Sequence, residues 1–337
     1  MTRERLRRAL WWVMVAMALA GVAFIWPMNA EAQNPFFVIP VASSAIVGAV
    51  LARRRPENPV GWVFLGVGAL AGVLTVAVVL TSWGASSPGA VPWWGMAAAW
   101  VAGWAWYPLL YLMTIPTLLL FPSGLLSPRW RIALWLPVAA LLCVTAMAAT
   151  APFIVVQYDD SGRVLREVAN PLSPGFMAGF DAPEDTGLFQ FFMLFFVAGL
   201  IAAIVSTGTR IKRARGVERL QMRWFGFSVA MFVPLIGLEA RFVDSGMLWM
   251  LVVEALVVAA VPVSCGIAIL RYRLYEIDRI ISRTTSYAIV TGALLTGYAV
   301  VVTTVTRLLP ESGSLAVASA TLMVAAVFRP LLHRVRR

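Results

Sequence analysis

The sequence predicts an all-α polytopic membrane protein of about ten transmembrane helices, with both termini in the cytoplasm and a small extracytoplasmic loop domain at 152–187. Three observations predict this fold. Hydrophobic residues make up 61% of the chain and charged residues 13%, which cannot be divided into a core and a solvated surface. Apolar runs of about 20 residues, the length that crosses a bilayer, recur between short polar breaks. The basic residues cluster in alternate breaks.

The apolar runs are predicted to form ten spans. The second run is short for a bilayer, and the last reaches a spanning length only by continuing through Pro330. The first run follows arginines, as in a signal peptide, but it is long for one and no small-residue cleavage pattern follows it cleanly, so we take it as a span. The predicted spans are 10–26, 36–51, 60–81, 95–121, 132–151, 188–208, 224–240, 247–270, 286–309 and 314–332.

The placement of arginine predicts the orientation of these spans. Cytoplasmic loops of membrane proteins carry an excess of Lys and Arg. With the N terminus inside, 23 of the 27 basic residues fall in cytoplasmic segments, and the four on the outer side are Arg163, Arg166, Arg241 and Arg307. A missed or invented span would have scrambled this alternation, so the even number of spans is favoured.

This topology divides the chain into four parts. They are the first five transmembrane helices at 1–151, an acidic extracytoplasmic loop at 152–187, the last five transmembrane helices at 188–332, and a basic cytoplasmic tail at 333–337 that starts a linker. We expect a multi-pass protein of the bacterial plasma membrane. The net charge of +11 is explained by this topology, so membrane lipids, and no nucleic acid, are the expected partners of the basic clusters.

The acidic loop at 152–187 contains six acidic residues and two arginines. Its first half has two short runs, Phe153 to Tyr158 and Arg163 to Val168, on either side of an Asp-Ser-Gly turn sequence, which predicts a small β-hairpin. We interpret the loop as a solvated lid. A sensing surface or a cation site is the alternative.

Catalytic patterns are absent from the sequence, which has no phosphate-binding glycine loop with Lys-Ser/Thr, no HExxH, no GxSxG and no CxxC. The single histidine, His333, lies in the basic tail without an acidic neighbour. Cys143 and Cys265 lie in separate apolar runs, without the spacing of a metal or redox pair. We therefore expect no enzyme activity, no metal and no cofactor in this chain.

Ionisable residues within the spans are few, and each is costly to bury in a membrane. Glu254 is the clearest, about two helical turns inside the outer end of the eighth run. An ion pair with Arg241 is our hypothesis for how this carboxylate is tolerated, with a protonated Glu254 as a variant of it. The alternative is a role in transport. Trp100 and Trp104, one turn apart, are interpreted as a packing face.

A second candidate segment follows the eighth span. Leu270, Leu274, Ile277 and Ile281 recur at helical spacing, which predicts an amphipathic helix. This helix is expected to lie in the headgroup layer or, alternatively, to act as a coupling element beneath the bundle. The charged residues of this possible coupling segment are Arg271, Arg273, Glu276, Asp278, Arg279 and Arg283.

Four passages resemble the membrane-embedded N-terminal input region of bacterial sensor histidine kinases. They are RRPENPVGW at 54–62, LFPSGLLSPRWR at 120–131, RGVERLQMRW at 215–224 and ILRYRLYEIDRIISRT at 269–284. The resemblance covers nearly the whole chain, in order. The sequence differs from the family at 123–125, where Ser-Gly-Leu replaces the usual Asp-Gly-Arg. In the family the last span leads to a dimerisation helix with the phosphorylated histidine and to an ATP-binding domain, and this chain ends at Arg337.

The resemblance implies a membrane-embedded sensory module of a two-component system that has no catalytic domain of its own and works with a second copy or a cytoplasmic kinase module. A truncated kinase, a domain and a free-standing subunit all fit the sequence. A transporter or permease, or a structural membrane subunit, is the alternative function. The stimulus is not encoded in any pattern that we can identify.

Overall fold

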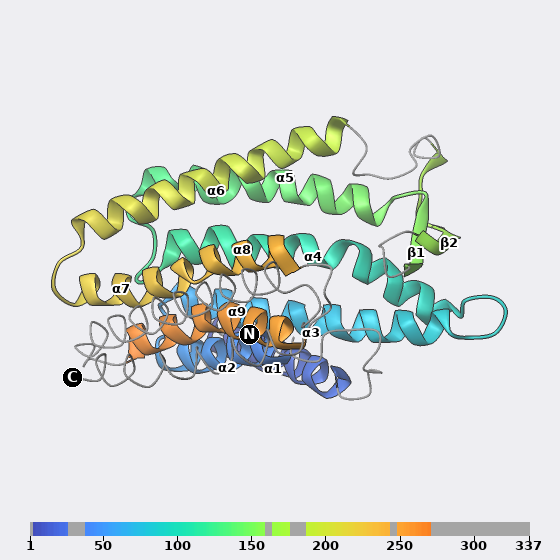
Figure 1. The fold of residues 1–337 in the computed structure, drawn as a ribbon, viewed down its shortest axis with the longest axis horizontal. Coiled ribbons are helices and arrows are strands. Elements are labelled where there is room, and N and C mark those ends of the chain that lie inside the picture. The colour runs from blue at the N-terminus through green and yellow to red at the C-terminus, as the bar shows by residue number, and fades with distance from the viewer. Residues whose placement is uncertain (1–2, 26–37, 159–163, 176–186, 243–247, 271–337) are drawn as a thin grey trace, which may run out of the picture. The chain divides into compact units, whose positions relative to one another are not determined.

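A computed structural model describes residues 3–25, 38–158, 164–175, 187–242 and 248–270 (Figure 1). These residues form helices and one two-stranded sheet. In chain order the elements are α1 (Arg3–Ile25), α2 (Val38–Arg54), α3 (Pro59–Ala85), α4 (Trp93–Leu120), the 3-10 helix η2 (Pro128–Trp130), α5 (Arg131–Ala149), β1 (Phe153–Tyr158), β2 (Val164–Ala169), α6 (Gly187–Arg213), α7 (Gly216–Ala230), α8 (Phe232–Phe242) and α9 (Leu248–Leu270).

Within the described ranges, seven helical stretches are long and apolar enough to cross a membrane. They are formed by α1, α3, α4, α5, α6, α7 continued into α8, and α9. This agrees with a multi-pass membrane protein. The remaining predicted span among these residues, α2, has 17 residues and ends in Arg53 and Arg54, so its apolar part is shorter than a bilayer requires. The ninth and tenth predicted spans lie outside the described residues, so the total of ten remains a prediction.

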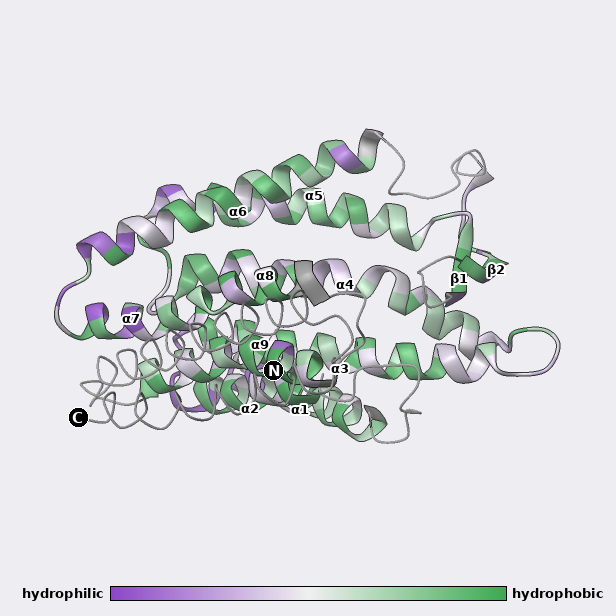
Figure 2. Ribbon diagram, viewed as in Figure 1, coloured by the Kyte–Doolittle hydropathy of each residue, from purple (hydrophilic) through white to green (hydrophobic). Residues whose placement is uncertain are grey.

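The predicted seventh span differs from the structure in two ways. Predicted as one helix over 224–240, it is divided at Met231 into α7 and α8. Pro234 has no N–H to donate to the carbonyl of Ala230, four residues earlier, so the helical ladder is interrupted here. The structure also extends α7 back to Gly216 through basic residues predicted to be a loop. Figure 2 shows α6 and α7 hydrophilic where they approach each other and more hydrophobic beyond.

Helix α3 packs against α1, α2 and α4 through glycines that bring the backbones together. A Cβ atom on Gly72 would lie 2.3 Å from the carbonyl oxygen of Met17 in α1, and a Cβ on Gly68 would lie 2.7 Å from Ala45 in α2. Toward the other end, Gly84 faces Gly95 of α4. Small residues are the usual means of close helix packing in membranes, where burial of apolar surface gives no driving force between helices.

Helix α4 contacts α3 and also the pair formed by α5 and α6 (Figure 1). Pro116 interrupts its hydrogen bonding, because proline has no N–H for the carbonyl of Leu112. The hydroxyl of Thr117 donates to that carbonyl instead, at 3.0 Å. A carbonyl left unpaired in a membrane helix is costly, so this bond allows α4 to continue past the proline.

The predicted β-hairpin is confirmed. Strands β1 and β2 are antiparallel, and Phe153 pairs with Ala169. The hairpin packs its Ile154 and Val156 against the start of α4. Arg166 donates to the carbonyl of Ala85, at 3.0 Å, and to that of Gly89, which ties the hairpin to the α3–α4 connection.

Candidate functional site at the basic end of the bundle

The connections between helices meet at two ends of the bundle. We call one the basic end: it comprises the start of α1, the α2–α3, α4–α5 and α6–α7 connections, and the last residues of α9. Hydrogen bonds described below join these segments to one another, while the hairpin and the α3–α4 connection share the opposite end. The basic end carries 15 basic residues among the described ones, so the predicted grouping of the connections is confirmed. That this end faces the cytoplasm remains a prediction.

Asn58 joins two connections at the basic end. It precedes Pro59 and caps α3, where its Oδ1 accepts a hydrogen bond from the amide of Val60 at 2.9 Å. An asparagine cap followed by proline in the first turn is a favoured helix start. The Nδ2 of the same side chain donates to the carbonyl of Pro122 at 2.8 Å. One amide group therefore starts α3 and holds the α4–α5 connection.

Arg210 ties the end of α6 to the same connection. The residue is only 4% exposed, and its guanidinium donates to the carbonyl of Phe121 and, at 2.7 Å, to that of Gly124. Gly124 has a φ of +110°, which a side chain would strain, so glycine is needed for its carbonyl to be presented here. Burying a charge is costly unless its donors are satisfied, and these carbonyls satisfy part of them.

Helix α7 connects this group to α9. Phe225 stacks on Phe121 with ring centroids 4.7 Å apart, in a cluster of buried residues that includes Cys265 of α9. Gln221 donates to the carbonyl of Ala268 at 2.9 Å, and the hydroxyls of Ser228 and Ser264 lie 2.9 Å apart. The connections of the basic end are therefore bound to the last turn of α9. We call this set of contacts the junction.

A polar cavity of about 320 Å³ lies within the junction. All four passages that carry the resemblance contribute to its wall, the fourth through its first residue, Ile269. The lining residues are Arg55, Glu57, Asn58, Pro122, Ser123, Val217, Gln221, Ala268 and Ile269. Among the described residues, no three of His, Cys, Asp or Glu lie close enough to hold a metal ion together. The junction therefore joins the starts and ends of α3, α4, α6, α7 and α9 by hydrogen bonds and packing around this cavity.

The structure places some of the predicted site residues and leaves others undetermined. Glu254 is partly buried in α9. Arg241 belongs to the last turn of α8, and the Arg241 side chain lies outside the described part of the structure. The ion pair between Glu254 and Arg241 therefore remains a prediction. The possible coupling segment also lies outside, beginning where α9 leaves the junction. Trp100 and Trp104 stack edge to face at 5.5 Å and the indole of Trp100 donates to Ala149, which confirms their role in packing.

Asn58, Arg210 and Gln221 were not singled out from the sequence. The Asn-Pro pair at 58–59 is a helix-start signal that could have identified Asn58. Arg210 was counted only as a topology charge, and nothing near Gln221 indicates its partner. Comparison with family models, with curated proteins and with solved structures finds no match for this chain.

Two substitutions at Asn58 are expected to separate its roles. Asn58→Ala removes both hydrogen bonds and is expected to lower the free energy of unfolding by about 1–3 kcal/mol. Asn58→Ser keeps a capping oxygen on α3 but is too short to reach Pro122, so it is expected to lose less. Unfolding in mixed micelles titrated with SDS measures both variants. Equal losses would show that the cap on α3 contributes nothing, and no loss in the variant that keeps the cap would show that the bond to Pro122 contributes nothing.

Proposed function

We propose that this chain is a membrane-embedded signal-input module, similar to that of a two-component sensor histidine kinase, without a catalytic domain of its own. It would change the packing of its helices in response to a stimulus and transmit the change through its basic end. The partner would be a cytoplasmic kinase module or a second copy of the chain. The observation that carries the proposal is the junction, where four separate passages interlock around the end of α9.

The position of the junction supports this role. The chain continues from Leu270 directly into the possible coupling segment, so a shift of α9 would move that segment. Through Gln221 and Phe225, α9 is linked to α7 and to the α4–α5 connection, and through Arg210 to α6. A rearrangement of these helices can therefore be transmitted to the C-terminal end of α9. Coupling of this kind needs packed elements with two arrangements, and the junction is the set of packed and hydrogen-bonded elements to which we assign this role.

A transporter would require polar groups along a path through the middle of the bundle. Among the described residues, the hydroxyls of several buried or partly buried residues bond to their own helix: Thr75 donates to Ala71, Thr81 to Ala77 and Ser82 to Val78. Such bonds satisfy the hydroxyls locally and form no path. Glu254, partly buried within α9, favours transport, so this function is the second candidate.

A hybrid protein tests the proposal. Residues 1–337 are joined in place of the input region of a histidine kinase with a reporter output, at a series of positions one residue apart. We expect the reporter signal of the kinase to vary with the position at which the two proteins are joined. We also expect that signal to change about 5-fold or more when Gln221→Ala removes the hydrogen bond between α7 and α9. Arg5→Gln, an exposed change on α1, is the control and should leave output unchanged.

A transporter or a structural subunit predicts a different result from the same hybrids. Output would then be independent of the joint, and Gln221→Ala would behave as Arg5→Gln does. That result, in hybrids that reach the membrane at normal levels, would overturn the proposed function.

A further inference from the structure

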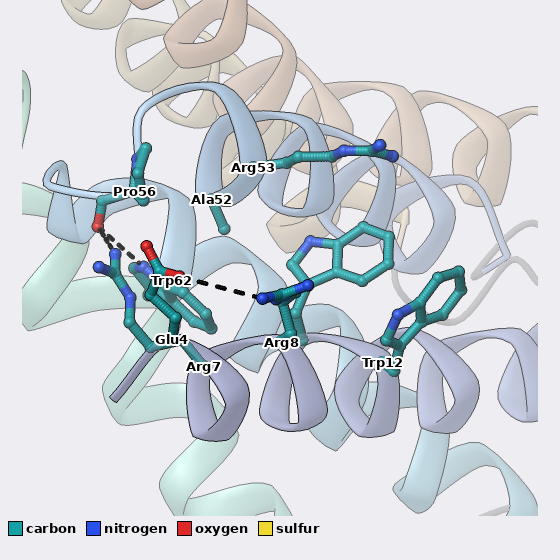
Figure 3. A pocket seen from close by; sticks show the side chains of 9 residues that line it. Glu4, Arg7, Arg8, Trp12, Ala52, Arg53, Pro56 and Trp62 are labelled. Carbon is teal, nitrogen blue, oxygen red and sulfur yellow. Dashed lines mark hydrogen bonds and ion pairs between the residues drawn. The ribbon is translucent and has the colours of Figure 1, made fainter. Parts of the chain in front are cut away.

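A second hollow, of about 460 Å³, opens at the basic end between α1 and the α2–α3 connection (Figure 3). Three arginines and three tryptophans line it, with a single carboxylate. The lining residues are Glu4, Arg7, Arg8, Trp11, Trp12, Ala52, Arg53, Pro56 and Trp62. The described side chains that line the hollow therefore carry a net charge of +2, and they lie beside the aromatic surface of the three tryptophans.

Part of this hollow is held firmly by hydrogen bonds. Arg7 donates to the carbonyl of Pro56 and lies over the ring of Trp62, 5.8 Å from its centroid. The indole of Trp62 donates to the same carbonyl at 3.2 Å, and that of Trp11 donates to Ala49 at 3.0 Å. Because these groups already have partners within the protein, they form a wall, and the ligand-binding groups must be sought elsewhere in the hollow.

Three other side chains remain available to a ligand. Arg53 makes no hydrogen bond or ion pair with any residue that the structure describes. Arg8 has an ion pair with Glu4 at 3.9 Å, and both side chains are largely exposed, so solvent weakens that pair. Trp12 is 64% exposed, with its ring edge to face with Trp11. Two guanidinium groups and an indole N–H can therefore turn toward one bound anion.

The location of the hollow indicates the source of that anion. It lies at the start of the predicted first span, and the side of α1 that exposes Trp12 also exposes Leu19, seven residues further along the helix. Arginine and tryptophan at the ends of spans lie at the level of the lipid headgroups. A ligand with a phosphate and attached acyl chains would satisfy both the guanidinium groups and this apolar face. A choline headgroup would instead place an ammonium beside two arginines.

We propose that this hollow binds the headgroup of an anionic phospholipid, with Arg8 and Arg53 on its phosphate and its acyl chains along Trp12 and the exposed face of α1. Binding would draw Arg8 away from Glu4. The proposal does not depend on the signalling function, since a transporter or a structural subunit could hold the same lipid.

Native mass spectrometry of the full-length protein, delipidated in detergent, tests this site. Phosphatidylglycerol and phosphatidylcholine with identical chains are the probes, and glycerol phosphate and inorganic phosphate are the soluble competitors. We expect the first phosphatidylglycerol to bind about 30-fold more tightly than phosphatidylcholine, as two arginine contacts near a headgroup can provide. Arg8→Gln with Arg53→Gln should abolish most of that preference.

The chain offers a matched control and a change of opposite sign. Arg5→Gln with Arg54→Gln removes the same charge from the same two helices, at exposed positions that do not line the hollow, and should keep the preference. Glu4→Gln removes the competing carboxylate and should tighten binding of phosphatidylglycerol, a gain that misfolding cannot produce.

Three results would overturn the proposal. They are equal binding of the two lipids by the unaltered protein, an equal loss in both double variants, and no tightening with Glu4→Gln. If inorganic phosphate displaces phosphatidylglycerol at comparable concentrations, the site takes a soluble phosphate and the lipid assignment is wrong.

Discussion

Replacing Arg210 by alanine is expected to lower the free energy of unfolding by about 3–5 kcal/mol. The substitution removes two hydrogen bonds from a charged donor and leaves the carbonyls of Phe121 and Gly124 without that partner in a mostly buried site. It also releases the end of α6 from the α4–α5 connection. Unfolding in mixed micelles titrated with SDS, followed by tryptophan fluorescence, measures the loss.

Two further variants define what the Arg210 result means. Lys212→Ala removes the same charge two residues away on the exposed face of α6 and is expected to change stability by less than about 0.5 kcal/mol. Arg210→Lys keeps the charge but not the planar guanidinium that reaches two carbonyls. Its loss of unfolding free energy should lie between those of Arg210→Ala and Lys212→Ala. If Arg210→Ala and Lys212→Ala were equally stable, the bonds of Arg210 to the connection would contribute nothing.

Gly72→Ala is expected to destabilise the protein by about 1–3 kcal/mol, although alanine is the better helix former. The added methyl group would lie 2.3 Å from the carbonyl oxygen of Met17 and 2.9 Å from the Cα of Ala18, both in the backbone of α1. Backbone cannot move aside as a flexible side chain can, so α1 and α3 must separate. The same SDS titration measures this effect.

The same substitution at Gly103 should have the opposite sign. Gly103 lies in α4, and a Cβ there would meet nothing within 4 Å. Gly103→Ala therefore gains helix propensity without a clash and should be neutral or more stable by up to about 1 kcal/mol. An unaffected Gly72→Ala would contradict close packing of α3 on α1, and a destabilised Gly103→Ala would contradict the open space beside Gly103.

The parts of the fold that hydrophobicity and turn chemistry determine could be predicted from the sequence. Seven of the predicted spans fall on helical stretches that can cross a membrane and another falls on the shorter α2, because an apolar run bounded by charges has few other solutions in a bilayer. The hairpin of β1 and β2 follows from two short runs on either side of the turn sequence Asp-Ser-Gly. Helix α7 was predicted to begin too late, because charged residues were taken to end the helix. Charge ends the apolar part of a span, whereas a helix can continue into the headgroup layer.

The junction could be predicted only in part. Charge identified the basic end, but the acceptors of Asn58, Gln221 and Arg210 are main-chain carbonyls, which every residue carries and no sequence pattern marks. The packing of Gly72 against α1 could not be predicted from the sequence for a related reason. A glycine in an apolar run is visible in the sequence, whereas the helix that approaches it depends on how the bundle assembles.

The arginines described above fasten the chain mainly to its own backbone. Three arginines each donate to main-chain carbonyl oxygens. Arg7 donates to that of Pro56, Arg166 to those of Ala85 and Gly89, and Arg210 to those of Phe121 and Gly124. A side-chain acceptor can be lost by mutation, but a carbonyl oxygen is present whichever residue occupies the position. A substitution at Pro56, Ala85 or Phe121 therefore leaves an acceptor in place, whereas Gly89 and Gly124 have a positive φ that restricts them to glycine. The identity of the residue thus matters at the donor and at these two acceptors, and much less at the other three.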